Sequence, residues 1–304
     1  MAIPERQLET WANQGAMASS AATYESIKNC ITNGSWKDDV HFQIYLQGSY
    51  KNTTNIYGDS DVDIVVEFTS IFHSDTSNLD NIGKEVHDAL GPGKYTLASF
   101  KAAIVKRLKV CYGDNAVTVG NKAIKVKGNN SRLDADVVVC NTYKKYNSNN
   151  GSRYLTAVKG IRFTEENTGN VIINYPTPHY DNGVSKNQYV RTNSNLKKVT
   201  RIFKNMKASL VNHQAMSSNT APSYFVECLL YNAYDNHFKN SSYQNIVVPI
   251  INQFINDDKS DACDKYVCQN EQRWLFGSGD QQWNRVDARE YVAKLVYVWE
   301  NYPL

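Results

Sequence analysis

Two closely spaced aspartates at the start of an apolar strand constrain this 304-residue chain more than any other feature of its sequence. Asp61 and Asp63 lead directly into the apolar run 64–66, and the stretch 61–68 has the composition of a strand. Because residues two apart on a strand face the same side, both carboxylates are expected on one face, about 7 Å apart at Cα. Two anions this close repel each other unless a cation lies between them. The pair therefore predicts a site for a divalent metal ion such as Mg²⁺.

A glycine and a serine precede this pair, and eleven residues separate them from it. The stretch 40–46 has the pattern of a strand and runs into Gly48 and Ser49, after which a polar stretch rich in Asn and Thr leads to Asp61. A glycine at the end of a strand lets the backbone approach phosphates, and a serine hydroxyl with its neighbouring N–H groups can hold a triphosphate. The pattern G-S-x11-D-x-D thus predicts a hairpin whose long loop holds phosphate beside the metal site.

A second acidic strand supplies a candidate third carboxylate. Asp134 and Asp136 lie on one face of a predicted strand that continues through 137–139. Two metal ions about 4 Å apart, as used in nucleotidyl transfer, need such a third ligand. Short acidic strings also occur by chance on solvated strand faces, where they have no function. The preceding Gly-Ser and the second acidic strand together favour catalysis over that alternative.

The first half of the chain predicts a mixed sheet backed by helices. The first thirty residues have the spacing of one or two helices, and apolar residues at helical spacing also mark 76–90 and 96–109. Short strands separated by Gly-Asn turns follow in 117–140. The fold class is therefore α+β.

The second half predicts helices. Strand character fades after about residue 165 apart from 171–174, and the composition of 176–183 is that of a loop. One amphipathic helix is marked by an apolar stripe, which consists of Val199, Ile202, Phe203, Met206 and Leu210. We therefore expect a catalytic lobe over 1–165, which includes an N-terminal helix, and a mainly helical nucleotide-binding lobe over 166–304.

The charge balance excludes a chain whose main role is to coat nucleic acid. Lys and Arg number 33 against 30 Asp and Glu, a formal net charge of +3, so nucleotide binding must be local and no stable DNA binding is expected. The sequence shows no long apolar run and no signal-peptide pattern, and we expect a cytoplasmic protein that does not bind membranes. The six cysteines show no dense, even spacing, so we interpret all of them as reduced thiols.

The residues singled out above resemble the polymerase-β nucleotidyltransferase superfamily. The sequence downstream narrows the resemblance to the cGAS/DncV-like nucleotidyltransferases (CD-NTases) of bacterial CBASS anti-phage systems, and the resemblance spans nearly the whole chain. The run from Lys122 through Val139 to Tyr146 is similar to the second catalytic strand of that family and its exit, which makes Asp136 the implied third metal ligand. Asp134, on the same face, could share or replace that role. The family usually has a proline soon after this aspartate, whereas this chain continues with three valines.

The resemblance also implies residues that bind the nucleotide. Residues 174–187 resemble the loop before the family's basic helix, and Lys204 and Lys207 are similar to basic residues of that helix that face a cleft and meet triphosphate oxygens, with Lys204 favoured. Ser223 and Tyr224 stand where the family places a serine on the triphosphate and an aromatic ring against the base. A solvated basic face and a core tyrosine are the alternative interpretations.

The implied fold is a polymerase-β-like mixed sheet with helices plus a C-terminal helical lobe, with the active site in the cleft between them. The implied activity joins nucleoside triphosphates, drawn from ATP, GTP, CTP and UTP, into a cyclic di- or trinucleotide second messenger for anti-phage signalling. Two Mg²⁺ ions, replaceable by Mn²⁺, are the implied cofactors; a separate effector reads the product, and we expect a monomer. Two alternatives stay open: a polymerase-β-type nucleotidyltransferase that modifies tRNA, protein or a small molecule, and a non-catalytic nucleotide- or RNA-binding module.

Overall fold

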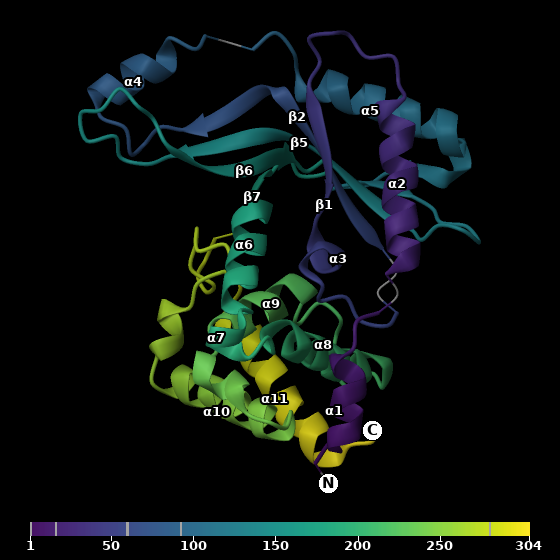
Figure 1. Ribbon diagram of the computed structural model, residues 1–304, viewed down its shortest axis with the longest axis vertical. Helices are drawn as coiled ribbons and strands as arrows, with labels where there is room; N and C mark the ends of the chain where they lie inside the picture. Colours follow the sequence, from purple (N-terminus) through teal and green to yellow (C-terminus); the bar gives the residue numbers. More distant parts are fainter. Residues whose placement is uncertain (1, 16, 59–60, 92, 280) are drawn as a thin grey trace. The chain divides into compact units, whose positions relative to one another are not determined.

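The protein divides into two compact units in the computed structural model, which describes residues 2–15, 17–58, 61–91, 93–279 and 281–304 (Figure 1). The sheet unit comprises Met17–Gly48 and Ser60–Thr177, and the helical unit comprises Met1–Ala16, Ser49–Asp59 and Pro178–Leu304. The predicted lobes 1–165 and 166–304 stay a prediction, whereas the compact units also place two short early stretches of the chain in the helical unit. Such long-range membership leaves no mark in the local sequence pattern.

A mixed sheet forms the centre of the sheet unit. Within the described residues it has seven strands, in the order β1-β2-β5-β4-β3, with β6 paired to β5 and β7 paired to β6. The strands are β1 (Phe42–Leu46), β2 (Val62–Asp75), β3 (Val117–Val119), β4 (Ile124–Val126), β5 (Ala135–Tyr146), β6 (Ala157–Thr164) and β7 (Val171–Asn174). The central pair β2 and β5 is parallel, and the other pairs are antiparallel. The predicted mixed sheet is therefore present.

Helices cover one face of this sheet. The sheet unit holds α2 (Ala18–Thr32), α4 (Asn81–Asp88), α5 (Leu97–Tyr112) and the 3₁₀ turn η1 (Asp114–Ala116). Phe68 of β2 stacks on Phe100 of α5 with ring centroids 4.4 Å apart, and the Tyr24 hydroxyl of α2 donates to the Ile44 carbonyl. Since strand residues alternate between faces, Asp63 lies on the face opposite Phe68. The aspartates are thus directed away from the helices that back the sheet.

The helical unit is built around one apolar core. Its elements are α1 (Glu5–Ala12), α7 (Tyr189–Thr192), α8 (Leu196–Asn212), α9 (Ser223–Tyr231), η2 (Asp235–Lys239), α10 (Gln244–Lys259), η3 (Ala262–Lys265) and α11 (Arg285–Asn301). The predicted apolar stripe on α8 is fully buried in this core, which confirms it. The short helix α3 (Gly48–Asn52) lies at the boundary: Gly48 is the last residue of the sheet-unit stretch Met17–Gly48, and the rest of α3 belongs to the helical unit. None of the helices in the described part of the chain is long and apolar enough to cross a membrane.

One segment predicted as a loop is a helix. Residues 176–183 lie within α6 (Pro176–Lys186), so the loop interpretation was wrong. Proline at the first helical position lacks only an N–H that has no partner inside the helix, and its fixed φ suits the helix start. The prolines at 176 and 178 therefore lie in the first turn of a helix and do not indicate a loop.

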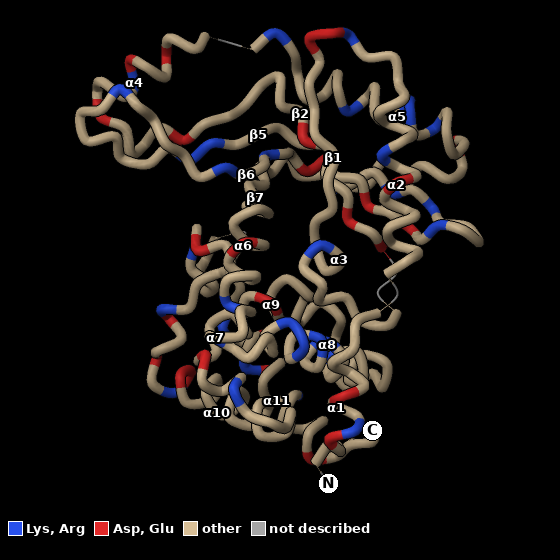
Figure 2. The backbone as a smooth tube through the Cα atoms, viewed as in Figure 1, with Lys and Arg blue, Asp and Glu red and all other residues tan. Residues whose placement is uncertain are grey.

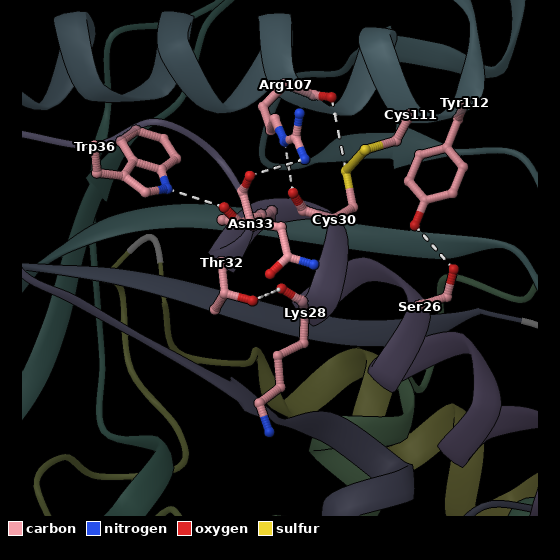
Figure 3. The surroundings of a disulfide bond; sticks show 10 residues. Ser26, Lys28, Cys30, Thr32, Asn33, Trp36, Arg107, Cys111 and Tyr112 are labelled. Carbon is pink, nitrogen blue, oxygen red and sulfur yellow. Dashed lines mark hydrogen bonds between the residues drawn. A yellow bond between two sulfur atoms is a disulfide. The ribbon is translucent and has the colours of Figure 1, made fainter.

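Two of the six cysteines are joined, which corrects the expectation of six reduced thiols. Cys30 near the end of α2 and Cys111 near the end of α5 form a disulfide across 81 residues of sequence (Figure 3). Arg107 supports the same junction, since its Nε donates to the Cys30 carbonyl at 2.6 Å and its Nη2 to the Asn33 carbonyl at 3.2 Å. The other four cysteines are free and buried. The pair was missed because its partners meet only through helix packing.

Candidate active site

Two of the three predicted metal ligands face each other across the central strand pair. Asp63 of β2 and Asp136 of β5 are Cα partners in the parallel register, so their side chains point to the same face. Asp61 stands just before β2, two residues from Asp63. Asp61 is exposed, whereas Asp63 and Asp136 are half-buried. On the other side of Asp136, Lys125 of β4 is its antiparallel partner.

Gly48 has a specific steric reason to be a glycine. Its φ is +67°, in the left-handed region, and a Cβ on it would lie 2.0 Å from Asp63 Oδ2. The neighbouring Gln47 N–H donates to the Asp63 carbonyl at 3.0 Å. The sequence predicted that this glycine allows a close backbone approach to phosphate. The group that the structure places against Gly48 is the carboxylate of Asp63.

Negative charge is concentrated at the start of β5. Burial raises the pKa of Asp136, Lys125 opposes that rise, and the nearby Asp61 and Asp134 add to it, so that the pKa lies above its ordinary value. The charged form of Asp136 is therefore disfavoured by its surroundings. A divalent cation on this face would reverse that effect, because it attracts each carboxylate that now repels its neighbours.

Asp134 has a separate structural task. It lies one residue before β5, it is exposed, and its Oδ1 accepts a hydrogen bond of 2.5 Å from the Gly128 N–H in the turn that precedes the strand. This bond engages the Asp134 side chain in the turn. The geometry therefore favours Asp136 over Asp134 as the third ligand.

The donors present on this face suit Mg²⁺ or Mn²⁺, which prefer carboxylate oxygens. Among the described residues, no group of three His, Cys, Asp or Glu side chains is gathered closely enough to form a complete metal site. Asp63 and Asp136 are nevertheless neighbours by strand register, Asp61 stands two residues before Asp63, and a cation would relieve the repulsion that raises the pKa of Asp136. These are the residues that would hold a divalent ion.

In the helical unit, Ser223 and Tyr224 open α9. Ser223 is exposed, and Pro222 at the N-cap supplies no side-chain hydrogen bond to the first turn. An uncapped helix start carries partial positive charge and N–H donors, which suit a phosphate. The Tyr224 ring is 39% exposed and already stacks on His179 and Trp283, with ring centroids 4.9 and 5.6 Å away. Tyr224 therefore belongs to an aromatic row before any base is bound.

The side chain of Lys204 is buried, although it was predicted to face a cleft. Figure 2 shows basic positions along α8, but Lys204 on this helix is only 2% exposed and its Nζ lies 2.6 Å from Glu227 Oε1. The expectation that Lys204 faces a cleft is wrong, because a buried carboxylate turns the ammonium group inward. Lys207, one turn further along, is partly exposed and stays the predicted phosphate-binding lysine of the two.

Sequence reasoning gave Glu227 no role, although a signal was present. Glu227 sits inside the apolar run 225–230 of α9, where its neighbours in sequence are buried. A carboxylate in such a run must itself be buried and paired with donors. That argument could have pointed to Lys204 as its partner.

Comparison with known proteins places the chain in a family. Residues 181–300 match the family model for the cGAS/DncV-like nucleotidyltransferase C-terminal helical domain. The cyclic nucleotide synthase CdnE01 of Staphylococcus haemolyticus is 36% identical and the match covers 99% of this chain and 100% of that protein. The cyclic UMP-AMP synthase of Rhodothermus marinus is 38% identical, with 98% of each chain covered.

A solved structure supports the same conclusion. The structure of the Rhodothermus marinus CdnE c-UMP-AMP synthase with Apcpp and Upnpp matches with a TM-score of 0.87 at 36% identity, covering 99% of this chain and 98% of that one. The resemblance predicted from the sequence is thereby confirmed, as is the fold class. The chain belongs to the cGAS/DncV-like nucleotidyltransferase family.

Proposed function

We propose that this nucleotidyltransferase joins nucleoside triphosphates into a cyclic di- or trinucleotide, which serves as a second messenger in anti-phage signalling and is read by a separate effector. The observation that carries the proposal is the row of carboxylates in which Asp63 and Asp136 are register partners and Asp61 is two residues away. Relatives that match over the full length of the chain are named cyclic nucleotide synthases. This supports ring formation over transfer to tRNA, protein or a small molecule.

The three aspartates would hold two Mg²⁺ ions, for which Mn²⁺ can substitute. When bound, these ions supply positive charge that activates the acceptor hydroxyl and neutralises the leaving pyrophosphate. Asp136 would align the acceptor ribose hydroxyl, while Asp61 and Asp63 would fix the donor triphosphate through the ions. Gly48 contributes indirectly, because its missing side chain leaves room for the Asp63 carboxylate.

The phosphates and the base would be held by other residues of the chain. Ser49 follows Gly48 directly, and Ser223 with the first-turn N–H groups of α9 offers further donors to phosphate oxygens. Lys207 would add positive charge. The exposed part of Tyr224 would contact the base beside its aromatic neighbours.

A cyclic dinucleotide requires two nucleotidyl transfers, and a cyclic trinucleotide requires one more transfer of the same kind before the ring closes. The acceptor hydroxyl attacks the α-phosphorus in line, and a new O–P bond forms as the bond to pyrophosphate breaks. The last transfer within the linear product closes the ring and releases another pyrophosphate. The side chains contribute positioning and charge stabilisation, which are the main sources of rate in such transfers.

ATP and UTP are the first substrates to test. The Rhodothermus marinus relative is named a cyclic UMP-AMP synthase, and its structure carries Apcpp and Upnpp, which are analogues of ATP and UTP. We propose the same pair for this chain, which acts as a monomer in the cytoplasm.

The proposal is tested by incubating the purified protein with all four triphosphates and Mg²⁺ or Mn²⁺ and analysing the products by mass spectrometry. A small, phosphatase-resistant product that disappears in Asp61→Ala/Asp63→Ala is expected. Identical products from this variant would refute the assignment of the carboxylates. Label transferred to a macromolecule would favour the other nucleotidyltransferases, and nucleotide binding without Mg²⁺ or turnover would favour a binding module.

A further inference from the structure

A buried carboxylate in the helical unit has no part in the reaction described above. Glu227 of α9 is 5% exposed, and both of its oxygens are hydrogen-bonded. Its Oε1 accepts from the Thr54 hydroxyl at 2.5 Å and from Lys204 Nζ at 2.6 Å. Its Oε2 accepts from Asn52 Nδ2 and lies against His179 Nε2, both at 2.9 Å. Because a carboxylate has about four acceptor positions, Glu227 has none left for a substrate.

Two of these four partners come from residues 49–58, which we call the connecting segment. Asn52 and Thr54 belong to it, and both are buried. Arg201 of α8 adds a further tie, since its Nη1 donates to the Thr53 carbonyl. The connecting segment is therefore held to the helices by a buried carboxylate and a buried guanidinium, and not by apolar contacts alone.

The charges within this cluster are balanced locally. Burial alone would raise the pKa of Glu227, but the ammonium of Lys204 and the hydrogen bond from His179 lower it well below its ordinary value. Lys204 Nζ also donates to the Thr54 hydroxyl at 3.3 Å. Thr54 thus accepts from the lysine and donates to the carboxylate, which fixes the orientation of its hydroxyl. Removing one member of such a network leaves buried polar groups unsatisfied.

We propose that Glu227 is a positioning residue, which fixes the connecting segment against α9 and so pre-aligns Ser49 with Ser223 and Tyr224 for the triphosphate. All of these residues lie within the helical unit. The segment begins with Ser49 and α9 begins with Ser223, so one carboxylate joins the two groups of phosphate donors. The inference rests on the proposed function, because it assumes that these serines bind a triphosphate. Pre-alignment lowers the ordering cost that binding would otherwise incur.

The first test uses a variant that spares the buried ion pair. Thr54→Val keeps the side-chain shape but removes the hydroxyl that links the segment to Glu227. Thr200→Val is the matched control, since Thr200 is a buried threonine of the same unit whose hydroxyl donates only to the Leu196 carbonyl within α8. We expect Thr54→Val to weaken binding of the ATP analogue Apcpp, measured by calorimetry with Mg²⁺, by about tenfold. Thr200→Val should bind the analogue as the wild type does.

A second pair of variants separates positioning from stability. Glu227→Gln leaves Lys204 buried without its counter-charge and should lower the melting temperature. Adding Lys204→Met removes both buried charges and should restore much of that loss. The analogue affinity should stay low in the double variant, because Asn52 and Thr54 have still lost their carboxylate acceptor.

The outcomes distinguish this inference from the proposed function. Affinity that recovers together with the melting temperature in the double variant, or equal affinities for Thr54→Val and Thr200→Val, would show a purely structural role and overturn the inference. Binding is measured without turnover, so a wild type that binds Apcpp but forms no cyclic product would refute the proposed function alone. A wild type that binds no analogue of any of the four nucleoside triphosphates would overturn both.

Discussion

The sheet unit and the helical unit each contain notable carboxylates, but the two groups differ in burial and in the sign of the nearby charges. In the sheet unit, Asp61, Asp63 and Asp136 are exposed or half-buried and crowd one another on one face of the sheet. In the helical unit, Glu227 is almost fully buried and surrounded by donors that occupy all of its acceptor positions. The pKa is raised for Asp136 and lowered for Glu227.

In the proposed function, this contrast distinguishes carboxylates that would bind metal ions from a carboxylate that positions a neighbouring segment. A carboxylate whose surroundings disfavour its charge can gain much from a ligand cation, whereas one whose charge is already neutralised can gain little. Carboxylates of the first kind can be recognised in the sequence, because the same D-x-D pattern occurs at the start of two strands. A carboxylate of the second kind, such as Glu227, is signalled by its place in an apolar helical run, but the donors around it become known only from the structure.

The largest expected effect tests the carboxylates that are proposed to bind the metal ions. Asp63→Asn should reduce product formation by at least about 10³-fold, since a lost metal ligand removes several kcal/mol of transition-state stabilisation. Asp136→Asn should reduce it similarly, and the melting temperature of that variant should stay the same or rise, because the surroundings of Asp136 disfavour its charge. Asp134→Asn is the control, since its side chain is bonded to the Gly128 N–H, and it should keep most of the activity. A large drop in stability for Asp136→Asn would contradict the contrast.

The disulfide should make the sheet unit, and not the helical unit, sensitive to reductant. Closing a loop of 81 residues stabilises a fold by about 4 kcal/mol in the chain-entropy model. Dithiothreitol should therefore lower the free energy of unfolding in urea and reduce amide-exchange protection in α2 and α5 first. The variant Cys30→Ser/Cys111→Ser should no longer respond to reductant. Equal loss of protection in α9 would argue against separate stabilisation of the two units.

A pair of glycine variants tests the crowding beside Asp63. Gly48→Ala should destabilise the protein by about 1–3 kcal/mol through backbone strain and should also reduce activity, because the new Cβ meets the Asp63 carboxylate. Gly58→Ala has the same kind of strain at φ +94°, but its Cβ would meet no atom of the described residues within 4 Å. Activity per folded molecule should therefore fall only in Gly48→Ala. Equal activities in the two variants would mean that Gly48 is needed only for its positive φ and not for the space it leaves to Asp63.

The smallest effect concerns a carboxylate at the surface of the helical unit. Burial raises the pKa of Asp258, but hydrogen bonds from Arg289 and Arg285 lower it below its ordinary value of 3.8. A lowered pKa means that the contribution to stability is present above pH 3.8 and is lost as the pH falls through the folded-state pKa. Asp258→Asn should therefore cost less than about 1 kcal/mol near pH 7 and nothing at the acid end of the range. Urea titrations of both proteins at several pH values would measure this difference.

Much of the sheet unit could be predicted from local pattern. The strands that carry Asp63 and Asp136 were expected, although Asp61, predicted as the first residue of its strand, lies just before β2. The parallel pairing of β2 with β5 did not follow, since register between distant strands depends on the whole sheet. The disulfide escaped prediction for the same reason, because Cys30 and Cys111 meet only through the packing of two helices.

The helical unit was predicted less well, because some of its charged residues are buried and not exposed to solvent. The apolar stripe of α8 is buried as expected, yet Arg201 and Lys204 of the same helix are buried too. They turn inward because a carbonyl group and Glu227 accept their hydrogen bonds. Helical periodicity predicts that charged residues such as these face solvent. The prediction fails where a hydrogen-bond acceptor from a distant part of the sequence is buried next to them. The roles of Ser49, Ser223, Tyr224 and Lys207 stay predictions.

The interleaved course of the backbone limits how this enzyme can be engineered. The chain passes from one unit to the other four times, after residues 16, 48, 59 and 177. A chimera that exchanged only the C-terminal half with a relative would graft a foreign α9 onto a native connecting segment. The side chain at position 227 would then come from the relative, whereas its donors Asn52 and Thr54 would come from this chain. Recombination aimed at altering base choice should therefore transplant 1–16 and 49–59 along with 178–304.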